Sequence, residues 1–103
     1  MATAGEAEAL NELGKVLTET TGPHAAAAVF EQAFTLARRV QSPLDEAHAL
    51  DGLAHCADHI GDRPTAVARM REAVALYQRL GSTETDQAAA YLAALENSAP
   101  ADE

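Results

Sequence analysis

The amino-acid sequence of this 103-residue chain repeats itself at an offset of about forty residues. The identical pairs at this offset are Glu6/Glu46, Ala7/Ala47, Ala9/Ala49, Leu10/Leu50, Leu13/Leu53, Ala26/Ala66, Ala28/Ala68, Ala33/Ala73, Leu36/Leu76, Arg39/Arg79 and Ser42/Ser82. The conservative pairs are Gly14/Ala54, Phe30/Met70 and Val40/Leu80. A fixed period of roughly 20 to 50 residues is typical of stacked supersecondary units, each of which buries its apolar face against its neighbours. The chain is therefore expected to use one structural unit twice.

Turn signals divide the sequence into segments of about twenty residues: Gly22-Pro23, Ser42-Pro43, Gly61-Asp62-Arg63-Pro64 and Gly81-Ser82-Thr83. Pro suits the first turn of a helix, where its missing N–H needs no partner, and Gly suits the left-handed position that closes a helix. Between these signals the apolar residues keep helical spacing. The expected packing stripes are Leu10, Leu13 and Leu17; Val29, Phe30, Ala33 and Leu36 or Ala37; Leu50, Leu53, Ala54 and Ala57; Ala66, Met70, Ala73 and Leu76 or Tyr77; and Ala88, Tyr91 or Leu92, and Leu95. No segment has the alternation of a strand, so the sequence predicts an all-α fold of five helices.

The repeating unit is a helix, a turn and a second helix. The first unit is expected at about 6–40 and the second at about 44–80, followed by a capping helix at about 84–97 and a disordered tail at 98–103. A chain of this length forms one domain, so we assign 1–103 to a single domain.

Charge and cysteine content restrict the possible partners. The chain has 16 acidic and 7 basic residues, a formal net charge of −9 and one Cys. Scattered cations on an acidic chain are poor ligands for phosphate, so we expect no direct binding of nucleic acid and no binding to a membrane. The single Cys suits a reducing compartment. No apolar run approaches the roughly 18 residues of a membrane span, and the N-terminus does not resemble a signal peptide, so the expected location is cytoplasmic.

The pattern of the two units resembles the tetratricopeptide repeat. In that family the first helix carries a large apolar residue and then Leu followed by a small residue, and the second helix carries Ala, a large apolar residue and Ala. The second unit matches with Leu50, Leu53-Ala54, Gly61-Asp62, Ala66, Met70 and Ala73, and the first with Leu10, Leu13-Gly14, Ala26, Phe30 and Ala33. The resemblance implies a right-handed α-solenoid of two units plus a capping helix. It also implies a non-catalytic module for binding proteins or peptides.

The long second helices give a finer resemblance. They end in Arg38-Arg39-Val40-Gln41-Ser42 and Gln78-Arg79-Leu80-Gly81-Ser82, and the period of about forty exceeds the usual thirty-four of the family. Such repeats resemble the variant in the C-terminal regions of actinobacterial regulators of antibiotic biosynthesis (SARP-like). This resemblance implies a part in bacterial transcriptional or signalling regulation, and an independent adaptor protein is the alternative.

The family's ligands usually lie in the concave groove formed by the first helices. Removing the packing stripe leaves the outward-facing positions of those helices. They are Glu8, Asn11, Lys15, Thr18 and Glu19 in the first unit and His48, Asp51, His55, Asp58 and His59 in the second; the same offset adds Tyr91 and Leu95. Because this set is acidic, a basic or amphipathic helical segment is the expected partner. Self-association through the first or last helix is a further expectation.

Two other kinds of site can be drawn from the histidines. His55 and His59 are four residues apart and could face a divalent metal, but an ordinary exposed helix face explains them more simply. His48-Ala49-Leu50-Asp51-Gly52 resembles the signature of histidine phosphotransfer domains, except that Asp51 replaces the Lys that would help to hold the phosphoryl group. A histidine phosphotransfer domain that uses His48 is the alternative function of a different class. The sequence has no phosphate-binding loop, no nucleophile elbow and no recognisable set of residues that would activate Cys56 as a nucleophile. We therefore expect no enzyme activity, no metal and no cofactor.

Overall fold

The computed structural model describes residues 2–98, and five helices without a strand make up this range. The helices are α1 (Ala4–Thr20), α2 (Pro23–Arg39), α3 (Pro43–Ile60), α4 (Arg63–Leu80) and α5 (Thr85–Asn97). The prediction of an all-α repeat fold is confirmed. The expected disordered tail, apart from Ser98, lies outside the described residues.

The helix ends follow from local sequence. Thr3 and Glu6 form a capping box at the start of α1, and the Asp62 side chain accepts a hydrogen bond from the backbone of Thr65 at the start of α4. Gly61 and Gly81 close α3 and α4 with φ of 96° and 65°. Gly22, between α1 and α2, has a φ of 123°, so three of the four connections use a positive φ that Gly adopts without steric cost.

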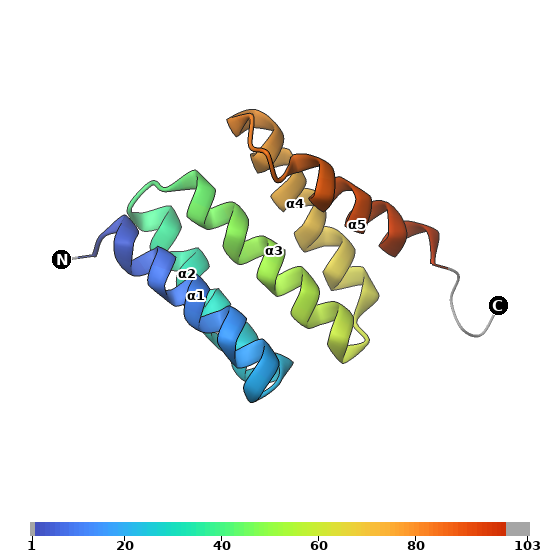
Figure 1. Ribbon diagram of the computed structural model, residues 1–103, viewed down its shortest axis with the longest axis horizontal. Helices are drawn as coiled ribbons and strands as arrows, with labels where there is room; N and C mark the ends of the chain where they lie inside the picture. Colours follow the sequence, from blue (N-terminus) through green and yellow to red (C-terminus); the bar gives the residue numbers. More distant parts are fainter. Residues whose placement is uncertain (1, 99–103) are drawn as a thin grey trace.

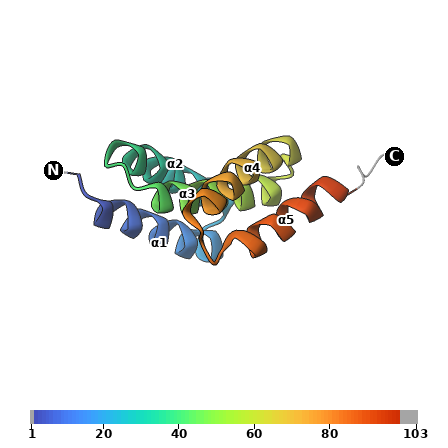
Figure 2. The ribbon, with the colours of Figure 1, turned by 90° about the horizontal axis from the view of Figure 1, so that it is seen from above.

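Successive helices pack side by side and form an elongated solenoid of 50 × 32 × 18 Å (Figure 1). Figure 2 shows α2 and α4 along one side of the molecule and α1 and α5 along the other, with α3 between them. The first helices of the two units, α1 and α3, are also in direct contact.

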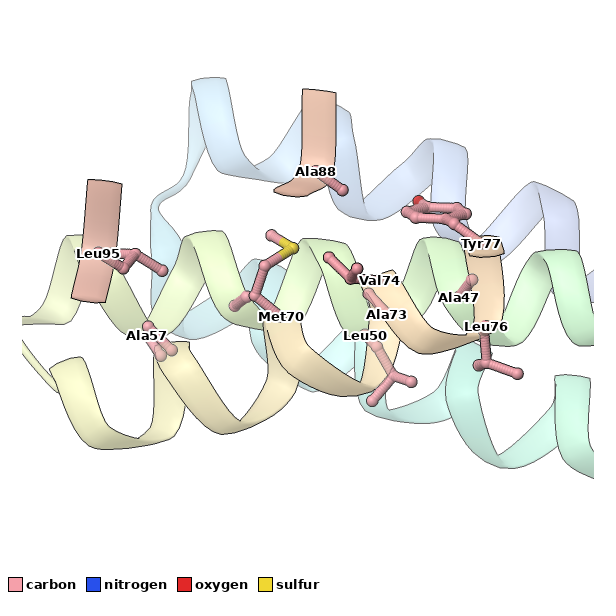
Figure 3. Packing of buried hydrophobic residues seen from close by; sticks show 12 residues of the cluster. Ala47, Leu50, Ala57, Met70, Ala73, Val74, Leu76, Tyr77, Ala88 and Leu95 are labelled. Carbon is pink, nitrogen blue, oxygen red and sulfur yellow. The ribbon is translucent and has the colours of Figure 1, made fainter. Parts of the chain in front are cut away.

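The larger core cluster joins α3, α4 and α5. Met70 of α4 is fully buried and extends toward Ala88 and Leu95 of α5, while Leu50 and Ala47 pack from α3 (Figure 3). Met70 was predicted to lie on the packing stripe of this helix, and its burial confirms that position. Small Ala side chains around it allow the helices to approach closely.

Phe30 holds the first unit against the second. Its ring lies between Gly14 of α1 and Gly52 of α3: a Cβ atom on Gly14 would be 2.6 Å from Cε1 of the ring, and one on Gly52 would be 2.5 Å away. Phe30 also packs against Leu53 and Cys56. Glycine is needed at both positions because the ring fills the space that a side chain would take.

The packing stripe predicted for α1 is wrong at Leu13. This side chain is 46% exposed, whereas Leu10 and Leu17 are half-buried against the rest of the fold. The helical spacing correctly placed these residues on one half of α1. The structure leaves Leu13 uncovered by any other helix within residues 2–98, and helical spacing alone does not predict this.

Candidate functional site

A groove of about 350 Å³ lies between α1 and α3 and reaches the start of α5. Its floor comes from α3, one wall comes from α1, and the rings of Phe30 and Tyr77 reach it from the second helices. Its lining residues are Lys15, Thr18, Glu19, Phe30, His48, Asp51, Gly52, His55, His59, Tyr77 and Glu84. The groove lies on the face where α3 is set back between α1 and α5 (Figure 2).

Asp51 is the polar centre of this floor. Its Oδ2 accepts a hydrogen bond of 2.9 Å from the hydroxyl of Tyr77, and its Oδ1 lies 3.1 Å from Nε2 of His55. Burial raises the pKa of the Tyr77 hydroxyl above its ordinary value, and the negative charge of Asp51 raises it further. The hydroxyl therefore stays protonated and keeps Asp51 in place on the floor.

Polar contacts also hold α5 at the edge of the groove. Nε2 of His48 lies 2.8 and 3.0 Å from the two carboxylate oxygens of Glu84, the residue that precedes α5. The ring of Tyr91 stacks on His55 with centroids 4.1 Å apart, and its hydroxyl donates a 2.6 Å hydrogen bond to Asp58. Burial, together with the hydrogen bond to Asp58, raises the pKa of Tyr91.

Most of the predicted groove residues come together. Seven of the twelve candidate side chains line the groove itself: Lys15, Thr18, Glu19, His48, Asp51, His55 and His59. Tyr91 lines an adjoining hollow of about 500 Å³ that shares Asp51, His55 and Glu84 with the groove. Asp58 is exposed beside it and bonded to Tyr91.

Three predicted positions require correction. Asn11 is only 2% exposed, because its amide donates a 3.0 Å hydrogen bond to the backbone carbonyl of Asp45 where α1 contacts the start of α3. Leu95 is buried in the core between α4 and α5 rather than facing the groove. Glu8 is exposed but lies outside the groove lining, toward the N-terminal end of α1.

The sequence interpretation missed four lining residues. Phe30, Tyr77 and Gly52 were assigned to packing or to a motif, yet they form the apolar part of the floor. Glu84 lies in the turn before α5, outside any repeat match. Its proximity to His48, 36 positions earlier, could not be predicted from local spacing.

The groove is acidic. Three carboxylates, Glu19, Asp51 and Glu84, line it with one ammonium group, that of Lys15. Two cations of α4 are paired elsewhere, since Arg71 lies 2.7 Å from Glu96, and Arg69 lies 3.8 Å from Glu31. A cationic ligand therefore matches the charge of the groove better than an anionic one.

The comparison with known families agrees with this architecture. A sequence profile described as tetratricopeptide repeat matches residues 5–79, which include both helix pairs. The chain belongs to the tetratricopeptide repeat family. No curated protein and no solved structure is significantly similar to the chain.

Cys56 and His48 are the side chains of this tetratricopeptide repeat domain whose reactivity the structure constrains most directly. The Cys56 thiol is buried, and burial raises its pKa, so it is a poor nucleophile. Among the described residues, no three His, Cys, Asp or Glu side chains come close enough to hold a metal ion. His48 contacts the carboxylate of Glu84 and lies one turn from Asp51, and both negative charges would oppose a phosphoryl group on its ring.

In the range 2–98, no helix is long and apolar enough to cross a membrane.

We expect Glu84→Ala to loosen α5 selectively. The buried residues of α5 are Ala88 and Leu95, and the contact between Glu84 and His48 holds its N-terminal end, whereas Tyr91 and Glu96 make their polar contacts farther along the helix. Hydrogen exchange should show the opening free energy of the α5 amides falling by about 1–2 kcal/mol, with α1 and α2 unchanged. Asp86→Ala removes an exposed carboxylate from the same turn and should have less effect. Equal acceleration by both variants would contradict the anchoring role of Glu84.

Proposed function

We propose that this domain is a non-catalytic module whose groove between α1 and α3 binds a basic or amphipathic helical segment of a partner protein. The observation that supports this proposal most strongly is the lining itself, in which Glu19, Asp51 and Glu84 stand against the single ammonium group of Lys15. The carboxylates would pair with Lys or Arg side chains of the partner. The rings of Phe30 and Tyr77 are 3% and 0% exposed, so they support the floor from below rather than contact the partner.

The proposal extends to the setting of the domain. A bacterial transcriptional or signalling regulator of the SARP-like kind is the setting that the long second helices favour, and an independent adaptor protein is the alternative. A cytoplasmic location forms part of the proposal, supported by a single Cys56 that is a free, buried thiol. In either setting the domain would act by holding a partner segment rather than by chemistry.

A charge reversal at Glu19 tests the groove. Glu19 is exposed and lines the groove, and Glu19→Lys would put a cation where the proposal requires a carboxylate. The probe is a fluorescent helical peptide of Leu and Lys, with a matched peptide of Leu and Glu as its counterpart. We expect the Kd of the Leu/Lys peptide to rise about tenfold in this variant, as lost and reversed charge pairing predicts.

Glu8→Lys is the matched control. It makes the same change of charge on the same helix, at an exposed position outside the groove lining. General attraction between an acidic protein and a basic peptide would weaken equally in the two variants, since their net charges are equal. Equal weakening, or tighter binding of the Leu/Glu peptide by the unmodified protein, would refute the proposed groove.

A further inference from the structure

The outer side of α1 carries apolar side chains that the described residues leave uncovered. Leu13 is 46% exposed and Val16 is 55% exposed, and Ala9 and Thr20 continue the same line along the helix at intervals of three and four residues. Such spacing puts all four on one helix face. In the part of the chain that the structure describes, α2 and α3 pack against other sides of α1.

The second unit shows how another helix covers the equivalent positions of α3. At the forty-residue offset, Leu13 and Val16 correspond to Leu53 and Cys56 of α3. These two residues are only 6% and 1% exposed, because they pack against Ala26 and Phe30 of α2. The covering helix thus presents a small residue and, four positions later, a large apolar residue.

Charges border this outer side. Helical geometry places Glu12 and Glu19 beside Val16, and Glu6 lies at its N-terminal end. Lys15 is 3.4 Å from Glu12 and neutralises part of this border. A covering helix with Lys or Arg beside its apolar residues would complement the carboxylates, whereas a second copy of the same face would bring like charges together.

We propose that the outer side of α1, formed by Ala9, Leu13, Val16 and Thr20, is a docking surface for an amphipathic helix of a partner protein. The docking helix carries a small residue followed four positions later by a residue of the size of Phe or Met, with cations at its border. It occupies the place on α1 that α2 occupies on α3. Glu19 and Lys15 at its border also line the groove, but Ala9, Leu13, Val16 and Thr20 lie outside that lining, so the inference does not depend on the proposed function.

The helix α2 itself supplies the probe. A labelled peptide with the sequence of residues 22–41 keeps Ala26, Phe30 and the cations near its end. Thr35→Lys, joined to Glu31 by a lactam bridge, holds the peptide helical through two positions that are exposed in α2. Fluorescence anisotropy should show saturable binding to the intact protein.

We expect the double variant L13Q/V16Q to raise the Kd of this peptide at least about tenfold, since it removes two large apolar contacts. The matched control L44Q/L80Q removes two similarly exposed apolar side chains elsewhere and should change the Kd less than about twofold. A peptide with Phe30→Ser should lose binding to the unmodified protein as well, which tests the surface without altering the protein.

Three results would overturn the inference. The first is no saturable binding at millimolar peptide. The second is binding that L13Q/V16Q leaves unchanged, as when the peptide replaces the protein's own α2 against α3. The third is sedimentation that reveals a dimer which L13Q/V16Q abolishes, because the surface would then belong to a second copy of the chain.

Discussion

Phe30→Ala is expected to lower the free energy of unfolding by about 3–5 kcal/mol, the range for removal of a well-packed aromatic side chain. Phe30 is buried and contacts Ala26, Leu53 and Cys56, so its loss leaves a cavity between α1, α2 and α3. The surrounding helices cannot close this cavity without moving one unit against the other. Urea unfolding followed by circular dichroism measures the change.

Substitution of Gly52 tests the same contact from the other side. In the unmodified protein, Gly52→Ala puts a methyl group 2.5 Å from the Phe30 ring, and Gly14 prevents the ring from moving away. We expect a loss of about 1–3 kcal/mol, in spite of the better helix propensity of Ala.

The effect of Gly52→Ala should reverse its sign when Phe30 is absent. In the Phe30→Ala background the methyl group has space, and helix propensity then favours Ala by about 1 kcal/mol. Gly5→Ala is the control, since a Cβ there meets only Thr3 Oγ1 at 3.6 Å and should behave alike in both backgrounds. A stabilising effect of Gly52→Ala in the unmodified protein would show that the ring does not require glycine.

The fold could be predicted because the period, the turn residues and the apolar spacing all specify the same unit. Phe30 and Met70 were placed on the packing stripes of the second helices, and Gly14 was matched to the small-residue position of the repeat. Gly52 escaped notice because its counterpart at the forty-residue offset is Glu12, so the repeat gave no sign of a packing role. Its need for glycine arises from a ring that is supplied by another helix.

The site was predicted better on α3 than on α1. Helix α3 has neighbours on both sides, so removing its packing stripe left the residues that face the groove, His48, Asp51 and His55 among them. On α1, removing the packing stripe wrongly predicted that Asn11 faces outward, whereas its amide bonds to the backbone at the start of α3. Helical spacing shows which residues share a face, but only the tertiary contacts decide which face is covered.

Because of the Tyr77 hydroxyl, the free energy of unfolding of the domain should fall as the pH rises above 10. At pH 7, Tyr77→Phe is expected to cost about 1–2 kcal/mol, because Asp51 loses a hydrogen bond on the groove floor. The pKa of Tyr77 is raised above its ordinary value near 10, first by burial and then by the charge of Asp51. The native state therefore keeps a proton that the unfolded chain releases above pH 10.

The sign of the pH effect follows from this difference in bound protons. Stability from Tyr77 is complete well below pH 10 and falls above it, with a slope that approaches about 1.4 kcal/mol per pH unit once the unfolded chain has lost this proton. Tyr77→Phe lacks this loss, so its deficit relative to the unmodified protein should shrink above pH 10 and vanish between about pH 11 and 12. Urea unfolding at pH 7, 9, 10 and 11 measures both curves. If the curves of Tyr77→Phe and the unmodified protein stay parallel up to pH 11, the hydroxyl of Tyr77 does not keep its proton on the groove floor.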